Sequence, residues 1–144
     1  MTIIIVVTIH FLGAVLELLD TLVFIGGFYN LAFGILHLFL SRLFHWKEDI
    51  AKLTLENRGM FQIFAMLVTL YLFFLAYVSI FHTETLLTTP MGMTIIGFIA
   101  LGWLVRTVGQ IVIYGGREWM SWVLAAIFSV GFILYLIPLI VILR

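Results

Sequence analysis

Several polar side chains that could do chemistry lie inside or beside long apolar stretches of this sequence: His10, Glu17, Asn30, His37, Gln62, Arg106 and Gln110. An imidazole can carry a proton and is a common ligand of metals and of haem iron. A guanidinium in apolar surroundings needs an acceptor or an anion. We interpret this set as a candidate ligand-binding site, with Gln62 and Glu17 at its margins.

The two histidines allow three roles, which the sequence leaves open. His10 and His37 are either neutral imidazoles hydrogen-bonded between helices, or a site for a proton or small ligand, or the two axial ligands of a non-covalent haem b. In the haem alternative the chain is a redox module, and a quinone near Arg106 would serve the same purpose. Nucleophilic catalysis has weak support, because the chain has no Cys and no Ser with a convincing His and acid neighbour. The metalloprotease spacing of His and Glu is also absent, so an enzyme is an unsupported alternative.

Lipid, and not water, is the main solvent that this composition predicts. Of the 144 residues, 65% are apolar and 10% are charged, whereas roughly a quarter of the residues are charged in soluble domains. The formal net charge is zero, so nothing points to a nucleic acid partner. The expected fold class is therefore an all-α helical bundle, integral to a membrane and forming one domain.

Five membrane-spanning helices are expected, since a helix needs about 20 apolar residues to cross the hydrocarbon. They cover roughly residues 2–19, 21–44, 59–82, 90–114 and 119–142. The first two come from one long apolar run, in which we place a turn at Glu17–Thr21, with Gly26-Gly27 as the other position. Four spans are the alternative, with one early segment that does not cross.

The ends of two segments carry capping signals. Thr89-Pro90 is typical of a helix N-cap followed by a first-turn proline, and Gly115-Gly116 of a helix end. Residues 46–57 place Trp46 and Leu53 on one helical face, which predicts a short amphipathic helix in the membrane interface. A plain solvated loop is the alternative for this segment.

Polar and small residues share one face within each of three predicted spans. The faces, each within about 80–100° of the helix circumference, contain His10, Gly13, Glu17 and Asp20; then Gly26, Asn30, Gly34, His37 and Ser41; then Gly102, Arg106, Gly109, Gln110 and Arg117. His10 and His37 each lie about 10 Å from the inner ends of their predicted helices. As consecutive spans pack antiparallel, we expect the two histidines to face each other.

Basic residues predict the orientation of the chain. Arg42, Lys47, Lys52, Arg58 and Arg117 share one side in the five-span arrangement, and the other side has only Arg144. Cytoplasmic loops carry the excess of Lys and Arg. The N-terminus is therefore expected inside and the C-terminus outside.

A resemblance to a family rests on a set of polar and aromatic positions: Phe28-Tyr29-Asn30, His37, Ser41 to Trp46, Asn57-Arg58, Gln62, Trp103, Arg106 and Gln110. Over most of residues 28–140 the chain resembles small bacterial multi-span membrane proteins without an assigned activity. The resemblance implies no particular chemistry. The expected location is a bacterial inner (cytoplasmic) membrane.

The function predicted from the residues is that of a non-catalytic accessory or homo-oligomeric membrane subunit, possessing a buried polar site for a proton, an ion or a small ligand. Its expected partners are the lipid bilayer and either further copies of the chain or a larger membrane complex. The redox module with haem b or a quinone is the alternative.

Overall fold

The computed structural model describes residues 1–44, 46–115 and 119–143, with the side chains of residues 2–6, 9 and 47 left out. Its elements are α1 (Thr2–Leu43), α2 (Trp46–Ala51), α3 (Leu55–Phe81), α4 (Thr83–Thr88), α5 (Pro90–Tyr114) and α6 (Trp119–Ile142). The described residues form no strand. Four helices are long and apolar enough to cross a membrane, namely α1 over His10–Leu43, α3, α5 and α6. The fold is thus an all-α bundle suited to a membrane.

The five-span prediction is not confirmed, because residues 2–19 and 21–44 belong to the single helix α1. The Thr21 hydroxyl donates to the backbone oxygen of Glu17 at 2.8 Å. Such a bond is compatible with a continuing helix and does not cap a new one. The four-span alternative therefore describes the architecture.

The glycines of α1 serve helix packing, which explains why the chain does not turn at Gly26-Gly27. A Cβ added to Gly26 would lie 2.7 Å from the Tyr135 ring, and one added to Gly27 would lie 2.6 Å from Ile80 Cγ1. These residues let α1 approach α6 and α3 closely. The sequence analysis gave this pair of glycines as an alternative position for a turn, and the structure shows a close helix crossing there instead.

The predicted interfacial helix at 46–57 does not form one element. α2 ends at Ala51, and α3 already begins at Leu55, where the Thr54 hydroxyl accepts a hydrogen bond from the Asn57 amide at 3.4 Å. The capping predictions at the ends of α5 agree with the structure. Thr89 Oγ1 accepts from the Gly92 amide at 3.0 Å, and Gly115 ends the helix with a φ of 56°.

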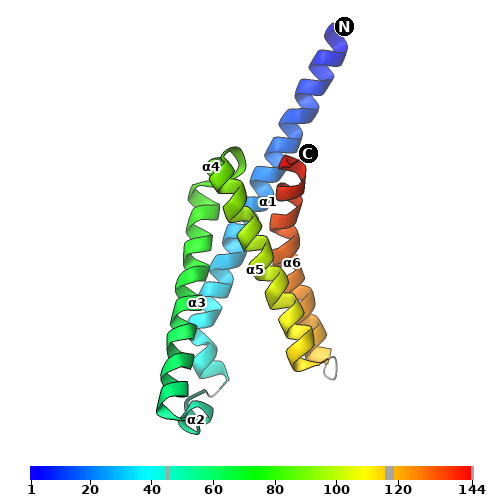
Figure 1. Ribbon diagram of the computed structural model, residues 1–144. Helices are drawn as coiled ribbons and strands as arrows, with labels where there is room; N and C mark the ends of the chain where they lie inside the picture. Colours follow the sequence, from blue (N-terminus) through cyan, green and yellow to red (C-terminus); the bar gives the residue numbers. More distant parts are fainter. Residues whose placement is uncertain (45, 116–118, 144) are drawn as a thin grey trace.

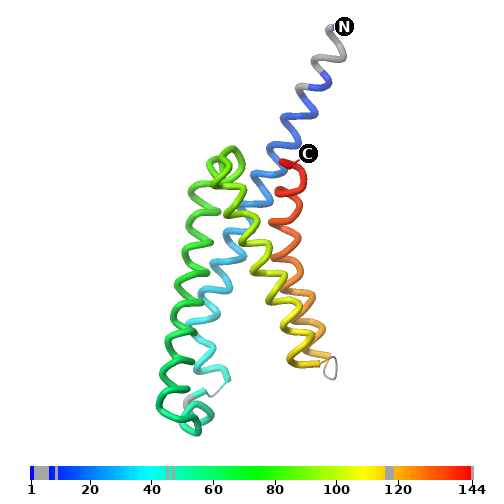
Figure 2. The backbone as a smooth tube through the Cα atoms, in the orientation of Figure 1, coloured from blue at the N-terminus to red at the C-terminus, as the bar shows by residue number. Residues whose placement is uncertain are grey.

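The four long helices form two antiparallel pairs, α1 with α3 and α5 with α6 (Figure 1). The pairs meet where α1 packs against α6, and they diverge toward the end of the bundle that holds α2, here called the α2 end. At the opposite end, the α4 end, the short helix α4 packs on α5. The tube in Figure 2 shows that the first part of α1 projects beyond the α4 end, past the C-terminal end of α6.

We expect Gly26→Ala to lower the free energy of unfolding in detergent micelles by about 1–3 kcal/mol, the usual effect of overpacking. The new methyl group would meet the Tyr135 ring, which is fully buried and has no room to move. Gly13→Ala is the control on the same helix, because nothing lies within 4 Å of its added Cβ. It should be neutral or stabilising by up to about 1 kcal/mol. Equal losses in both variants, measured by circular dichroism, would contradict this packing.

Candidate functional site

A hydrogen-bond network at the centre of the bundle joins all four long helices. The Tyr135 hydroxyl of α6 accepts from Asn30 Nδ2 of α1 at 2.7 Å and shares a hydrogen bond of 2.8 Å with Ser79 Oγ of α3. Trp103 Nε1 of α5 donates to Asn30 Oδ1 at 3.1 Å. We call these four residues the central polar network.

Burial makes the central polar network structurally important. Asn30, Ser79 and Tyr135 are 0% exposed. Water therefore cannot replace a hydrogen bond that one of these side chains loses. A buried polar group without a hydrogen bond costs about 1–3 kcal/mol. Each member finds its partner on a different helix, and the network therefore fixes the register of α1, α3, α5 and α6 relative to one another.

Close packing around the network depends on a second glycine. A Cβ on Gly131 would lie 2.6 Å from the Trp103 ring and 2.8 Å from the Tyr29 ring. Toward the α2 end the network continues into an aromatic cluster, in which the Phe33 ring centre is 5.0 Å from that of Trp103 and 5.7 Å from that of Phe128. This part of the interior is filled by rings.

A second polar cluster lies on the α2 side of these rings. Arg106 Nη1 donates to Gln110 Oε1 at 2.9 Å, and the Arg106 Cζ atom lies 4.0 Å from the centre of the Phe128 ring. Gln110 is 3% exposed and its Nε2 donates to Ser121 Oγ at 3.4 Å. His37 of α1 is half-buried and makes no hydrogen bond with Arg106; an electrostatic interaction alone links the two side chains. We call Arg106, Gln110, Ser121 and His37 the arginine cluster.

The structure brings only part of the predicted site together. His37, Arg106 and Gln110 form the arginine cluster, whereas Asn30 belongs to the central polar network. Gln62 is exposed on α3. The remaining two predicted residues are exposed on the N-terminal part of α1: His10 and Glu17.

The predicted pairing of His10 with His37 is wrong. Both lie on α1, and 27 positions along one helix separate them by about 40 Å. They do not flank one haem iron within a chain, since the axial ligands of an iron lie on its two faces. Among the described residues, no group of three or more His, Asp or Glu side chains is placed to hold a metal ion.

The chain has no match among known proteins in three comparisons. No family model matches it, no curated protein matches it, and no solved structure matches it.

Sequence reasoning missed three members of the central polar network: Ser79, Trp103 and Tyr135. A signal was present, because Trp and Tyr favour the membrane–water interfaces, whereas Trp103 and Tyr135 lie well inside their helices. An aromatic residue with a polar atom far from the helix ends needs a buried partner. The partner, Asn30, was itself among the predicted site residues.

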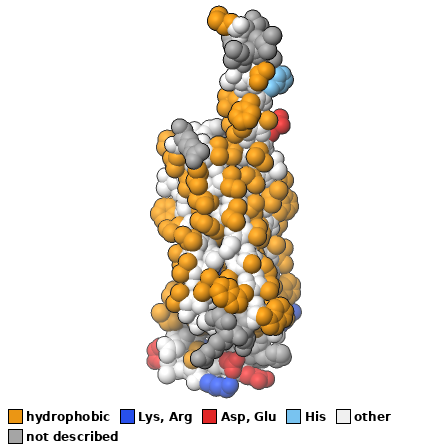
Figure 3. Space-filling model, turned by 90° about the vertical axis from the view of Figure 1, so that its right-hand side faces the viewer, with side chains coloured by type: hydrophobic (Ala, Val, Ile, Leu, Met, Phe, Trp, Pro, Cys, Tyr) orange, Lys and Arg blue, Asp and Glu red, His pale blue; other side chains and the backbone are white. Residues whose placement is uncertain are grey.

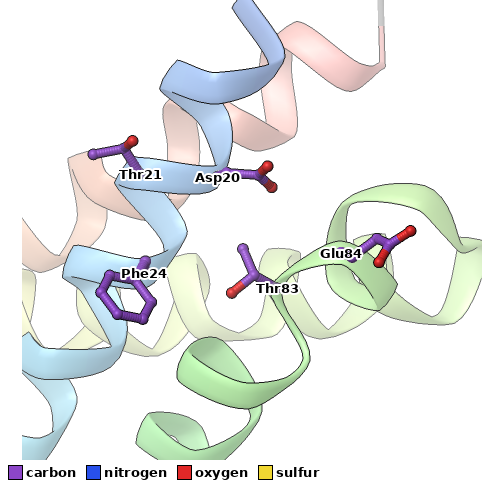
Figure 4. A pocket seen from close by; sticks show the side chains of 5 residues that line it. All are labelled: Asp20, Thr21, Phe24, Thr83 and Glu84. Carbon is purple, nitrogen blue, oxygen red and sulfur yellow. The ribbon is translucent and has the colours of Figure 1, made fainter.

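A shallow depression of about 390 Å³ lies at the α4 end, lined by Asp20, Thr21, Phe24, Thr83 and Glu84 (Figure 4). The Thr21 and Thr83 hydroxyls each donate to the backbone oxygen four residues earlier, that of Glu17 and that of Ser79. Asp20 and Glu84 are exposed. The hydroxyls that line the depression are therefore not available to donate to a ligand. The carboxylates of Asp20 and Glu84 make this end of the bundle polar.

We expect Tyr135→Phe to lower the free energy of unfolding in micelles by about 1–3 kcal/mol, because Asn30 Nδ2 and Ser79 Oγ would lose a buried partner. Tyr77→Phe is the control: its hydroxyl bonds to His82 at an exposed position and should matter by less than about 0.5 kcal/mol. In a double-mutant cycle with Ser79→Ala, the effects should be non-additive. Additive effects would mean that the two hydroxyls are not coupled.

Proposed function

We propose that the chain is a non-catalytic membrane subunit that associates with further copies of itself through α1. The observation that carries the proposal is the projecting segment, residues 7–16 of α1, which is apolar and stands clear of the bundle. The central polar network supports a structural role, since its polar groups bind one another and leave no pair of groups poised as nucleophile and base.

Charged residues on α1 indicate which part of this helix lies in the hydrocarbon. Positions 21–41 hold no charged residue between Asp20 and Arg42, and as a helix they span about 31 Å. The hydrocarbon is about 30 Å thick. Glu84 lies beside Asp20 in the same depression, which supports a membrane boundary at that level. The projecting segment then stands outside the hydrocarbon.

An apolar helix outside the membrane is stabilised when another surface buries its apolar side chains. Within the projecting segment Phe11 is 71% exposed and Val7 is 62% exposed, and Figure 3 shows apolar side chains over it. Burying such surface contributes about 25 cal/mol per Å². A short helix in water has little stability of its own. A protein surface that packs against the segment would therefore stabilise both.

A second copy of the chain could bury the projecting segment, because an exposed stripe runs along α1 from that segment into the membrane. Its members alternate at spacings of four and three: Val7, Phe11, Ala14, Leu18, Thr21, Ile25, Phe28, Ala32, Ile35 and Phe39. This spacing is the seam of a left-handed coiled coil. Two copies in one membrane present identical stripes at the same height and in the same direction, so a parallel α1–α1 pair would bury both.

The redox alternative is not supported by the arrangement of the chain. Its two proposed iron ligands lie far apart on α1, and the exposed His10 is on the projecting segment. A quinone could accept hydrogen bonds from Arg106 as other ligands could, but no observation on the described residues favours it. The self-associating subunit is therefore the function that the geometry supports best.

The orientation that we propose differs from the sequence-based expectation because α1 crosses once. Arg42, Lys52 and Arg58 lie at the α2 end. The side chain of Lys47 and all of Arg117 lie outside the described residues. The positive-inside rule then places the α2 end in the cytoplasm. The N-terminal end of α1 and the C-terminal end of α6 both lie outside. A bacterial inner membrane stays a prediction.

Single cysteines test self-association, because the chain has no Cys of its own. Leu18 belongs to the stripe and is 54% exposed, whereas Leu16 is 53% exposed and lies about 160° away around the helix. We expect Leu18→Cys to give a disulfide-linked dimer on mild oxidation in membranes, and Leu16→Cys to give several-fold less. Equal yields, or no dimer from Leu18→Cys, would contradict the proposed pairing.

Two exposed glutamates at opposite ends test the orientation. We expect Glu84→Cys to react with a membrane-impermeant maleimide on intact cells, and Glu56→Cys to react only after the membrane is opened. Both positions lie in the first turn of a helix and are exposed, so their reactivity in detergent serves as the internal control. The reverse pattern would place the α2 end outside.

A further inference from the structure

The arginine cluster holds a positive charge that has no negative partner among residues 1–44, 46–115 and 119–143. Among the described residues the only ion pair is that between Lys52 and Asp49. The carboxylates of the described part lie toward the two ends of the bundle: Glu17, Asp20 and Glu84 at the α4 end, and Glu48, Asp49 and Glu56 near α2. Arg106 is thus surrounded by the uncharged Gln110 amide and the Phe128 ring.

The depth of Arg106 makes this arrangement costly unless an anion approaches. Arg106 lies eight positions before Tyr114, the last residue of α5, and hence about 12 Å from the end of the helix. A charged side chain at such a depth is costly in hydrocarbon and usually has a partner. Val105, which precedes it on α5, is apolar and 62% exposed.

The guanidinium of Arg106 is held by a hydrogen bond and a ring contact, and it retains N–H groups that donate to neither. One N–H bonds to Gln110 Oε1, and one face of the group covers the Phe128 ring. Gln110 is itself held by Ser121, which donates to its backbone oxygen at 3.4 Å. An arginine has five N–H donors, and Arg106 remains exposed. Its other N–H groups are therefore open to a group that arrives through the bilayer.

We propose that Arg106, together with His37, binds the phosphate group of an anionic phospholipid between α1 and α5. The phosphate would accept a forked pair of hydrogen bonds from the guanidinium, and an N–H of the His37 imidazole would face it from α1. The acyl chains would cover apolar side chains of α5. The site lies on the half of the bundle next to the proposed cytoplasmic face, where basic positions between helices bind acidic headgroups.

This inference goes beyond the proposed self-association and is independent of it. The exposed stripe of α1 that would pair two copies does not include His37, which is half-buried. A monomer could bind the lipid, and a dimer could form without it. The two proposals therefore fail separately, one in the cross-linking yield and the other in lipid binding.

The test uses the full chain in detergent with three added probes: dioleoylphosphatidylglycerol, dioleoylglycerol and inorganic phosphate. The two lipids share their acyl chains and differ in the phosphate headgroup. We expect phosphatidylglycerol alone to raise the thermal midpoint and to be retained in native mass spectra. In Arg106→Gln the affinity for it should fall roughly tenfold or more, the usual size of a charge-assisted bond.

Arg42→Gln is the matched control, because it removes one positive charge from an exposed position at the α2 end and should keep the lipid effect. If Arg106→Gln does not fold, His37→Gln tests the same site from α1 and should weaken binding several-fold. Equal stabilisation by both lipids, or an unchanged affinity in both variants, would overturn the proposal. Stabilisation by inorganic phosphate without an effect of phosphatidylglycerol would show a soluble anion as the ligand and overturn the lipid assignment.

Discussion

Hydrocarbon offers no hydrogen-bonding partner, so each polar group inside this bundle must find one within the protein. The Tyr135 hydroxyl is the place where the fold meets that requirement, because it joins Asn30 of α1 to Ser79 of α3. Trp103 adds α5 through Asn30. Helices that pack by apolar contact alone could slide along one another in lipid. The network allows one register, and the positions of the glycines and rings around it follow from that register.

The same requirement separates what the sequence could predict from what it could not. The membrane class and the apolar segments near 59–82, 90–114 and 119–142 follow from composition and length, and the ends of α5 follow from local capping chemistry. The number of crossings before Arg42 did not follow. A pair of glycines is compatible with a turn and with a close helix crossing. The crossing is shown by the contacts of Gly26 with Tyr135 and of Gly27 with Ile80, which are distant in sequence.

The outcome for the candidate site has the same cause. Arg106 and Gln110 were placed together correctly, because positions i and i+4 on one helix are neighbours whatever the rest of the fold. The pairing of His10 with His37 depended on the expected turn and failed with it. Tyr135 was not recognised, since its hydroxyl belongs to no periodic pattern of polar residues in the apolar helix α6. The prediction that used only spacing along one helix agrees with the structure, whereas the one that depended on the topology does not.

The two polar clusters then differ in a way that bears on function. The central polar network is closed: its donors and acceptors are matched, it is fully buried, and it leaves nothing for a ligand. The arginine cluster is open: its charge is unmatched among the described residues, and it lies on the α2 side of the aromatic rings, against Phe128. The unmatched cation lies three positions, about one turn, from Trp103 of the satisfied network, and a group from outside the chain would complete this second site. The bilayer that surrounds the chain contains such a group, the phosphate of its own lipids.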